Sequence, residues 1–443
     1  MAATRPIKAR ERDAIIQALR AGVVPRVGLQ HVQVGRSAEI KEMIRDIERI
    51  ADGGSTIRFV IGAYGAGKTF FLHLVRLIAM EKKLAVMHAD LAPDRRLHAT
   101  GGQARSLFNE LTRNLSTRSK PEGGAVKNIV ERFISEAVRQ SRSENRPVQE
   151  LIHERLHSLS ELVSGFDFAD VLNAYYEAHE AHEEQRQEAV LRWLRGEFGT
   201  KTESRAALGV RDIIDDDDIY DYMKLYAQFV RMAGYEGLLI CVDELVNLYK
   251  LQSAKARQQN YEQVLRILND VLQGSATGLG FLMGGTPEFL MDTRRGLYSY
   301  EALESRLAQN SFASDGLVDL SGPVIGLQNL SPEDLYVLLA NVRRVFASGD
   351  PAKELVPNEA LKAFMQHCSE RIGDAYFRTP RSSIRAFVGL LSVLEQNPQA
   401  DWRELLGAVD VEEDRDSDSI LDGPDKDAAP RSSDDDELTD FRL

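Results

Sequence analysis

The chain has 443 residues, of which 43% are hydrophobic and 28% are charged. This length allows roughly two to four domains, and this balance excludes a mostly disordered, collagen-like or disulfide-framework chain. The net charge is −13, but residues 411–443 hold 13 acidic and 4 basic side chains, so the preceding 410 residues carry only −4. A local phosphate-binding surface is compatible with the small net charge of residues 1–410, although that charge does not predict one.

The sequence contains no obvious membrane or export signal. No apolar run approaches the ~18–20 residues that cross a bilayer, and the opening MAATRPIKARERD lacks the apolar centre of a signal peptide. We therefore expect a cytoplasmic protein without membrane contacts. Cys241 and Cys368 lie far apart and have no metal-ligand spacing, so we interpret both as reduced packing residues.

In chain order, the first elements alternate between helix and strand. Residues 7–19 have the spacing of an amphipathic helix, and Ser37 could cap a second helix. A β-branched strand at 57–61 precedes a glycine-rich turn and a helix at 70–80, and a second strand is predicted at 84–91. This order is that of a βαβ unit.

Two further apolar runs, 237–242 and 279–283, predict a third and a fourth strand. Strands that alternate with helices favour a parallel sheet with helices on both faces. Between the second and third strands, residues 92–236 look almost wholly helical, with loops at 120–124 and from Gly199, so we expect an inserted helical subdomain.

The C-terminal part predicts a helical bundle and then a tail. Residues 331–406 have helical spacing, and Ser331 begins a Ser-x-x-Asp capping pattern. Residues 411–443 are too polar to bury a core, so we expect them to be disordered. The predicted domains are an N-terminal helix (1–26), an α/β core in two parts (27–119 and 206–328), a helical insertion (120–205), a helical lid (329–410) and an acidic tail (411–443).

One segment carries the strongest chemical signal. Residues 62–69 match G-x-x-x-x-G-K-[ST] between a strand and a helix. Glycines let backbone N–H groups surround a phosphate, the lysine reaches the β- and γ-phosphates, and the threonine hydroxyl binds Mg²⁺. The sequence therefore predicts an ATP and Mg²⁺ site. Its predicted nucleotide contacts here are Gly62, Ala63, Tyr64, Gly65, Ala66, Gly67, Lys68, Thr69 and the adjoining Phe70.

Polar residues follow the third and fourth strands, where the carboxyl edge of the sheet would face the nucleotide. We interpret Asp243 as a metal ligand and Glu244 as the general base for water. Thr286 follows the fourth strand and could position the water or contact the γ-phosphate; the alternative is a plain turn residue. Arginines that could stabilise the transferring phosphoryl group are Arg294, Arg295, Arg306, Arg381 and Arg385.

This constellation resembles AAA+ and related STAND-type ATPases. The wording of IGAYGAGKTFFL, LLICVDELVNLYKL, LGFLMGGTPEF and RIGDAYFRTPRSSIRAFVGLL is similar to the bacterial ATP-binding protein family typified by BrxD of BREX phage-defence systems. The likeness spans about residues 27–396. It implies an α/β, AAA+-like P-loop NTPase with a C-terminal helical lid.

The resemblance also implies roles for single residues. Asp243 and Glu244 would form the Walker B pair, Thr286 would be sensor 1, Arg381 would be the sensor-2 arginine, and Arg306 would act across a subunit boundary. The segment 32–36 would contact adenine and ribose, through Val32, Gly35 and Arg36. Expected partners are further copies of the chain and defence proteins such as a helicase.

Alternatives remain open at this level. The chain could be an ATP-dependent switch or scaffold with negligible hydrolysis. The pair Arg343-Arg344 could belong to a DNA-binding surface or to a solvated helix face. The segment from His153 to His157 matches H-E-x-x-H, a zinc-protease pattern, but Arg155 inside it and its charged surroundings argue against that interpretation.

Overall fold

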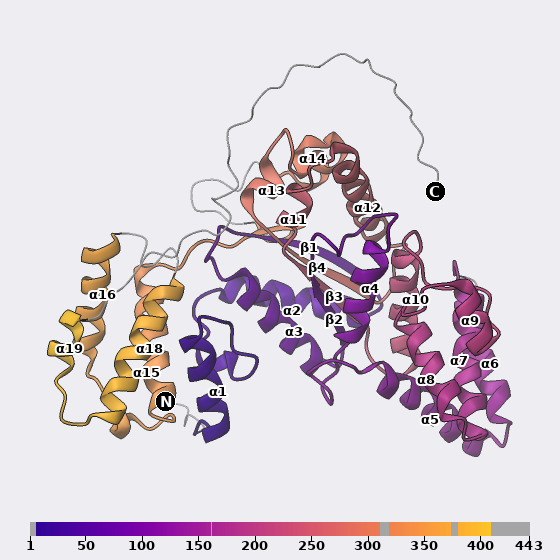
Figure 1. The fold of residues 1–443 in the computed structure, drawn as a ribbon, viewed down its shortest axis with the longest axis horizontal. Helices are drawn as coiled ribbons and strands as arrows, with labels where there is room; N and C mark the ends of the chain where they lie inside the picture. Colours follow the sequence, from indigo (N-terminus) through magenta and orange to yellow (C-terminus); the bar gives the residue numbers. More distant parts are fainter. Residues whose placement is uncertain (1–5, 161, 311–318, 374–379, 409–443) are drawn as a thin grey trace, which may run out of the picture.

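The computed structural model describes residues 6–160, 162–310, 319–373 and 380–408. At its centre lies a five-stranded, all-parallel sheet with the strand order β2-β3-β4-β1-β5 (Figure 1). The strands are β1 (Ser55–Ile61), β2 (Ala85–Asp90), β3 (Leu238–Asp243), β4 (Leu279–Gly285) and β5 (Val324–Gly326). The predicted α/β sheet is confirmed, and β5 is an addition: three residues are too few for a periodic signal.

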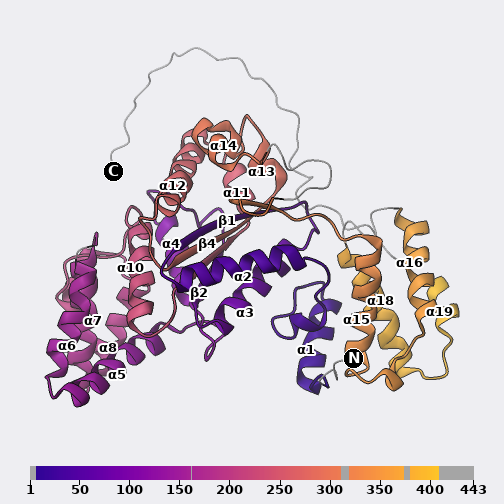
Figure 2. The same cartoon turned by 180° about the vertical axis from the view of Figure 1, so that it is seen from behind.

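Helices cover both faces of the sheet, which explains why its strands are apolar almost without alternation. One face packs on α2 (Ser37–Ala51) and α3 (Lys68–Glu81), and the other on α4 (Gln103–Arg113), α10 (Ile219–Met232) and α12 (Ala254–Leu272) (Figures 1 and 2). Successive strand residues point to opposite faces: Val60 joins the cluster under α2 and α3, whereas Phe59 joins the cluster on the other side.

The strand order separates the two strands that carry the predicted phosphate chemistry. β4 pairs with both β1 and β3, so β1 and β3 are not neighbours. Their carboxyl ends still reach the same edge of the sheet because all strands are parallel. This edge is where ligands bind in open α/β sheets.

The long connection between β2 and β3 is helical, as expected. After α4 it forms α5 (Val126–Glu144), α6 (Val148–Ser160), α7 (Gly165–Glu180), α8 (Glu184–Leu194) and α9 (Lys201–Leu208). The prediction of a loop from Gly199 is wrong, because Thr200 caps a helix by accepting a hydrogen bond from the Glu203 N–H (3.2 Å). The domain limits 120–205 stay a prediction.

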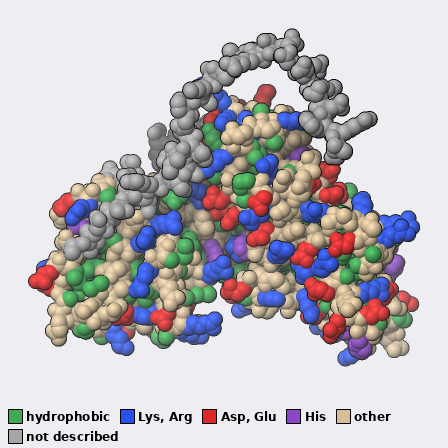
Figure 3. Space-filling view, in the orientation of Figure 1, with side chains coloured by type: hydrophobic (Ala, Val, Ile, Leu, Met, Phe, Trp, Pro, Cys, Tyr) green, Lys and Arg blue, Asp and Glu red, His purple; other side chains and the backbone are tan. Residues whose placement is uncertain are grey.

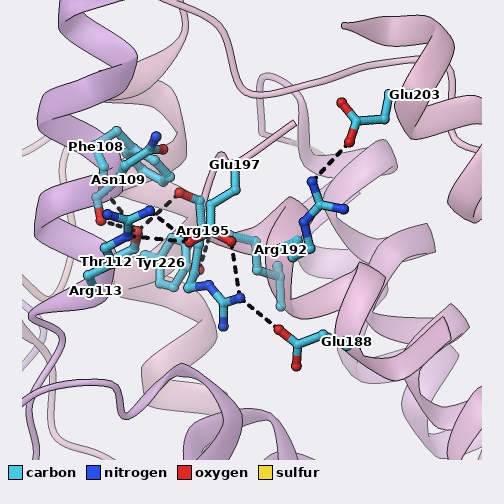
Figure 4. Close-up of polar contacts among 11 residues, drawn as sticks. Phe108, Asn109, Thr112, Arg113, Glu188, Arg192, Arg195, Glu197, Glu203 and Tyr226 are labelled. Carbon is cyan, nitrogen blue, oxygen red and sulfur yellow. Dashed lines mark hydrogen bonds and ion pairs between the residues drawn. The ribbon is translucent and has the colours of Figure 1, made fainter. Parts of the chain in front are cut away.

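These helices do not form an independent core. Their apolar side chains belong to the same buried cluster as one face of the sheet, with Phe168 of α7 packed edge-on against Tyr226 and Phe229 of α10. Figure 4 shows polar contacts that fix the end of α8 here. Tyr226 Oη donates to the Leu194 carbonyl (2.8 Å), and Thr112 Oγ1 of α4 donates to the Arg195 carbonyl (3.2 Å). The insertion is thereby fixed to α4 and α10.

Short helices follow the strands β3 and β4. They are α11 (Val246–Tyr249), α13 (Pro287–Met291) and α14 (Glu301–Leu307), with 3-10 turns at η1 (Leu29–His31), η2 (Leu297–Ser299) and η3 (Pro351–Lys353). Together with α12, the helices α11, α13 and α14 lie beyond the upper edge of the sheet in Figure 1.

The C-terminal helices enclose a second core. They are α15 (Pro332–Phe346), α16 (Asn358–Ile372), α18 (Pro380–Gln396) and α19 (Trp402–Ala408). The N-terminal helix α1 (Ala9–Arg20) packs on α15 and α18 and contributes Ile15 and Ile16 to this core (Figure 2). Arg12 of α1 donates to the Phe346 carbonyl (2.9 Å), so α1 belongs structurally with the C-terminal helices.

Several smaller expectations are settled by local geometry. Ser331 and Asp334 form the predicted capping box of α15. Ser37 does not cap α2: Arg36 is the N-cap residue, in a left-handed conformation (φ 62°), and makes no side-chain cap. Cys241 and Cys368 are buried and unpaired. The acidic tail, 411–443, lies outside the described residues.

No helix within the described ranges has the length and apolarity to span a bilayer.

Candidate nucleotide-binding site

The glycine-rich loop joins β1 to α3 at the carboxyl edge of the sheet. Gly65 and Gly67 adopt left-handed φ values of 79° and 82°, which other residues rarely adopt. Gly67 is the N-cap of α3, and Lys68 and Thr69 begin the helix. The loop therefore presents backbone N–H groups and the positive end of the α3 dipole to the cavity, as an anion site requires.

Lys68 folds back over this loop. Its Nζ donates to the carbonyl oxygens of Gly62 (2.8 Å) and Ala63 (3.0 Å). Carbonyl oxygens attract the ammonium only as dipoles, whereas a phosphate carries full charge. The ammonium group is thus positioned at the loop, and a bound phosphate would attract it more strongly than these carbonyl oxygens do.

Thr69 and Asp243 meet across the sheet edge, although 174 positions separate them. Thr69 Oγ1 donates to Asp243 Oδ2 at 2.9 Å. The other carboxylate oxygen, Oδ1, accepts from the Glu244 N–H at 2.9 Å. Asp243 is only 8% exposed, so its carboxylate is fixed by these contacts in a nearly buried position.

Gly284 on β4 makes room for this carboxylate. A Cβ on Gly284 would lie 2.2 Å from Asp243 Oδ1 and 3.0 Å from its Cγ, which forces a displacement. Sequence reasoning missed Gly284 as a site residue; the double glycine before Thr286 was the available signal. Its role comes from the lateral pairing of β3 with β4, which places the two residues side by side.

We expect Gly284→Ala to disable the site without unfolding the protein. The added methyl would displace the Asp243 carboxylate from Thr69, and a misplacement of this size costs about 10²-fold in turnover. Steady-state ATP turnover and circular dichroism measure the two quantities. Gly389→Ala on α18 is the matched control, because no atom of the described residues outside its own helix backbone and chain neighbours lies within 4 Å of the added Cβ. Wild-type turnover in Gly284→Ala would show that the carboxylate position is unimportant.

Glu244 stands in a strained backbone conformation. Its φ is 59°, in the left-handed region that disfavours residues with a Cβ. Such strain persists where the surroundings enforce it, and it is common at functional sites. Here the Asp243 carboxylate holds the Glu244 N–H, and the next residue, Leu245, donates to the Gly284 carbonyl (3.0 Å). The exposed Glu244 side chain consequently lines the same cavity as Thr69 and Asp243.

Thr286 lies at the carboxyl end of β4 and also lines this cavity. Its hydroxyl accepts a hydrogen bond from the Phe289 N–H (3.4 Å) and caps α13. The side chain has therefore a local structural task in addition to the role predicted for it.

The cavity has a volume of about 1520 Å³ and extends from the loop to the segment after α1. Phe70 and the buried Val32 are among its lining residues; Gly35 is not, and packs against the Asp334 carboxylate. Arg36 lines the cavity but donates to the carbonyls of Ala66 (3.1 Å) and Gln328. Burial lowers the pKa of the Arg36 guanidinium. The adenine-side role of these residues stays a prediction.

The candidate arginines lie at different places. Arg381, at the start of α18, lines the cavity, and its Nη1 donates to Tyr64 Oη of the glycine-rich loop (3.3 Å). Arg306 on α14 is exposed and lies outside the cavity; it donates to Asn269 Oδ1 (2.8 Å) and the Ala302 carbonyl (2.7 Å). A position outside the cavity is what an arginine acting on a neighbouring copy needs.

The other three candidates, Arg294, Arg295 and Arg385, do not line the cavity either. Arg295 donates to the carbonyls of Tyr249 (3.3 Å) and Leu251 (3.4 Å), which gives it a structural task. Among the described residues, the side chains of Arg294 and Arg385 make no hydrogen bond with the glycine-rich loop. Of the five arginines, Arg381 alone lines the cavity beside the glycine-rich loop within the described ranges.

The donor set fits Mg²⁺. The threonine hydroxyl and carboxylate are hard oxygen ligands, and Mg²⁺ takes one or two protein oxygens together with phosphate and water. By contrast, the two histidines of the H-E-x-x-H segment lie exposed on α6, and Glu154 pairs with Arg146 (2.9 Å). Across the described parts of the chain, no group of three or more His, Cys, Asp or Glu side chains is placed to hold a metal.

The parallel sheet, the glycine-rich loop and the strand-end carboxylate define the class of protein: a P-loop NTPase-like α/β protein with a helical C-terminal region. Residues 7–410 match the family described as BREX system ATP-binding protein BrxC/D. The chain therefore belongs to this family of ATP-binding proteins of the BREX phage-defence system. Comparison with curated proteins gives no match.

Proposed function

We propose that this protein is a Mg²⁺-dependent ATPase whose nucleotide state drives or licenses a partner complex in phage defence, acting on DNA. The observation that supports hydrolysis best is the 2.9 Å contact between Thr69 Oγ1 and Asp243 Oδ2, with Glu244 next in the chain. Family membership supports ATP as the nucleotide.

Each residue has a part in the proposed reaction. Backbone N–H groups of the loop and Lys68 bind the β- and γ-phosphates and stabilise charge on the transferring group. Thr69 and Asp243 would hold Mg²⁺, which neutralises phosphate charge when it is bound. Glu244 orients the attacking water and accepts its proton. Arg381 is close enough to the loop to exchange Tyr64 Oη for a phosphate oxygen.

The hydrogen bond between Arg381 and Tyr64 suggests how nucleotide binding would move the C-terminal helices that form the lid. Arg381 belongs to α18, and α1 packs on α15 and α18 through a shared core. An arginine that shifts from Tyr64 to a phosphate would carry these helices with it. The proposed output to a partner is this movement of the C-terminal helices relative to the sheet.

The direct test of the proposal is phosphate release by the purified full chain with ATP and Mg²⁺, measured with and without duplex DNA. Steady turnover that requires Mg²⁺ is expected. ATP binding without turnover, in both conditions and at all protein concentrations, would instead favour the second candidate, an ATP-dependent switch or scaffold that recruits proteins such as a helicase.

The DNA surface suggested by Arg343 and Arg344 loses support. Arg343 is only 8% exposed and donates to the Val356 carbonyl (3.0 Å) and Asn358 Oδ1 (2.9 Å). A buried arginine that satisfies internal acceptors cannot present its charge to a duplex. Contact with DNA, if it is direct, must use residues other than Arg343.

We expect a slowly hydrolysed ATP analogue to promote self-association, because Arg306 is exposed and lies outside its own cavity. Light scattering should show a larger species with the analogue than with ADP, and turnover per chain should rise with protein concentration. Arg306→Ala should lower turnover, whereas Arg10→Ala, an exposed control on α1, should not. A monomer in every nucleotide state, with turnover independent of concentration, contradicts the assembly.

A further inference from the structure

The cavity extends past the glycine-rich loop along the outer side of α3. This part, which we name the α3 lobe, is lined by His73 and Arg76 of α3, His88 and Asp90 of β2, and Asn114 and Arg118 of the segment before α5. None of these residues belongs to the motif of the nucleotide site. Figure 3 shows Lys, Arg and His side chains gathered near the centre of one face of the molecule, in the region of α2 and α3.

Arg76 is the unexplained residue of the α3 lobe. In the ranges that the structure describes, its guanidinium makes no hydrogen bond and no carboxylate lies within 4.0 Å of it; its Nε is buried without an acceptor. A buried donor without an acceptor costs about 1–3 kcal/mol, and more when it is charged. Burial also lowers the pKa of this group. An acceptor supplied by a ligand would offset that cost.

The neighbouring charges favour an anion as that ligand. Burial, together with the cations Arg76 and Arg26, lowers the pKa of His73 to about 4. Burial, Arg76 and His73 lower the pKa of His88 to about 3. Both imidazoles therefore lie in a positive local field. His73 is also hydrogen-bonded to the backbone of Arg26, and His88 to the backbone of Asn114, so the two imidazoles flank Arg76 and are not themselves free donors.

The carboxylates of the region make no ion pair with Arg76 in the ranges that the structure describes. Asp243 is engaged by Thr69 and by the Glu244 N–H, and Glu81 pairs with Arg118 (3.2 Å). Burial and Asp243 raise the pKa of Asp90, which is exposed and not paired with Arg76. Asp90 attracts the Arg76 guanidinium but makes no ion pair with it in the described ranges, so the hydrogen-bond donors of Arg76 stay available to a ligand.

The lobe is joined to the phosphate site through one face of α3. Thr69, His73 and Arg76 are spaced i, i+4 and i+7, which places them on one side of the helix. At 1.5 Å per residue, Arg76 lies about 10 Å beyond Thr69 along the axis. Arg76 therefore lies further along α3 than the glycine-rich loop, within the same cavity.

We propose that the α3 lobe is a second oxyanion site, which binds inorganic phosphate through the Arg76 guanidinium, in a pocket that His73 and His88 flank. A guanidinium presents two parallel N–H groups to a tetrahedral oxyanion. The phosphate can come from solution or from the hydrolysis proposed above; only the second source rests on that proposed function.

The test is equilibrium binding of radiolabelled inorganic phosphate to the full chain, with the nucleotide site filled by ADP and Mg²⁺. Wild-type protein should bind phosphate, Arg76→Gln should bind it at least tenfold more weakly, and the exposed control Arg10→Gln should be unchanged. Phosphate binding that is absent from the wild type, or equal in Arg76→Gln, overturns the proposal. The proposal is also overturned if Arg76→Gln weakens the binding of a single-stranded oligonucleotide but not the binding of phosphate.

A second measurement needs no variant at Arg76. Phosphate should shift the imidazole resonances of His73 and His88 in histidine-labelled wild-type protein, and leave those of the exposed His153 unchanged. Resonances that do not move at saturating phosphate contradict the site. Repeating the titration in Lys68→Ala without nucleotide separates the two proposals, because the α3 lobe should bind phosphate even if ATP is never hydrolysed.

The source of the phosphate is decided by product inhibition. Phosphate that inhibits ATP turnover at saturating ATP in the wild type but not in Arg76→Gln assigns the lobe to the product. Binding without such inhibition assigns it to phosphate from solution. Both results support the site and distinguish its two sources.

Discussion

Lys68→Ala is expected to weaken ATP binding and to slow ATP turnover by at least about 10²–10³-fold, the effect on turnover of losing one preorganised, charged donor to a phosphate. The wild-type ammonium is held at the loop by the carbonyls of Gly62 and Ala63, so the variant loses a ligand for phosphate rather than a part of the core. Equilibrium binding of a fluorescent ATP analogue and phosphate release measure the two effects.

The fold should survive this change because Lys68 lies at the start of α3, outside the apolar clusters of the sheet. Lys82→Ala is the matched control: Lys82 follows the same helix and makes only an exposed ion pair with Glu48 (3.1 Å). Folded Lys68→Ala protein with wild-type affinity and turnover would remove the glycine-rich loop from the function.

Glu244→Gln is expected to keep ATP binding and to slow hydrolysis by at least about 10²-fold, as expected when a positioned base is lost. Glutamine retains the shape and hydrogen bonding of glutamate but cannot accept the proton from water. Single-turnover phosphate release, with ATP binding measured in parallel, separates the chemical step from binding. The difference should appear in the rate constant and not in the affinity.

The backbone of Glu244 offers a control that separates chemistry from strain. Glu244→Gly removes the Cβ at φ 59° and so relieves the left-handed strain, while it also removes the carboxylate. We expect this variant to be as inactive as Glu244→Gln and at least as stable to thermal unfolding as the wild type. Turnover at the wild-type rate in both variants would give Glu244 a structural role and favour a switch over an enzyme.

The sequence predicted best those features that are formed by residues close together in the chain. Residues 62–69 form one contiguous loop whose glycine conformations and helix N-terminus depend on local geometry, so a motif is enough to locate the phosphate site. The Ser331 capping box is likewise complete within four residues. The pairing of Asp243 with Thr69 could be expected from the rule that parallel strands end at one edge.

The sequence analysis did not predict some other features of the structure, for identifiable physical reasons. The strand β5 has three residues and no measurable periodicity, and α9 begins at a Thr200 cap inside a segment that is polar enough to resemble a loop. Arg343 looked like a surface charge, but the packing of α15 against the segment before α16 buries it and supplies its acceptors. For Arg343, contacts distant in the chain outweigh local composition.

By itself, then, the sequence determined the strand-loop-helix phosphate site, the strand-end carboxylates and the helical character of the flanking regions, because periodicity, capping and glycine conformation act over a few residues. Only the tertiary structure decided that β4 lies between β1 and β3, that Gly284 must lack a side chain beside Asp243, and that α1 packs with the C-terminal helices. These depend on which faces are buried against each other. Many weak apolar contacts over the whole chain determine that choice, and no short motif encodes it.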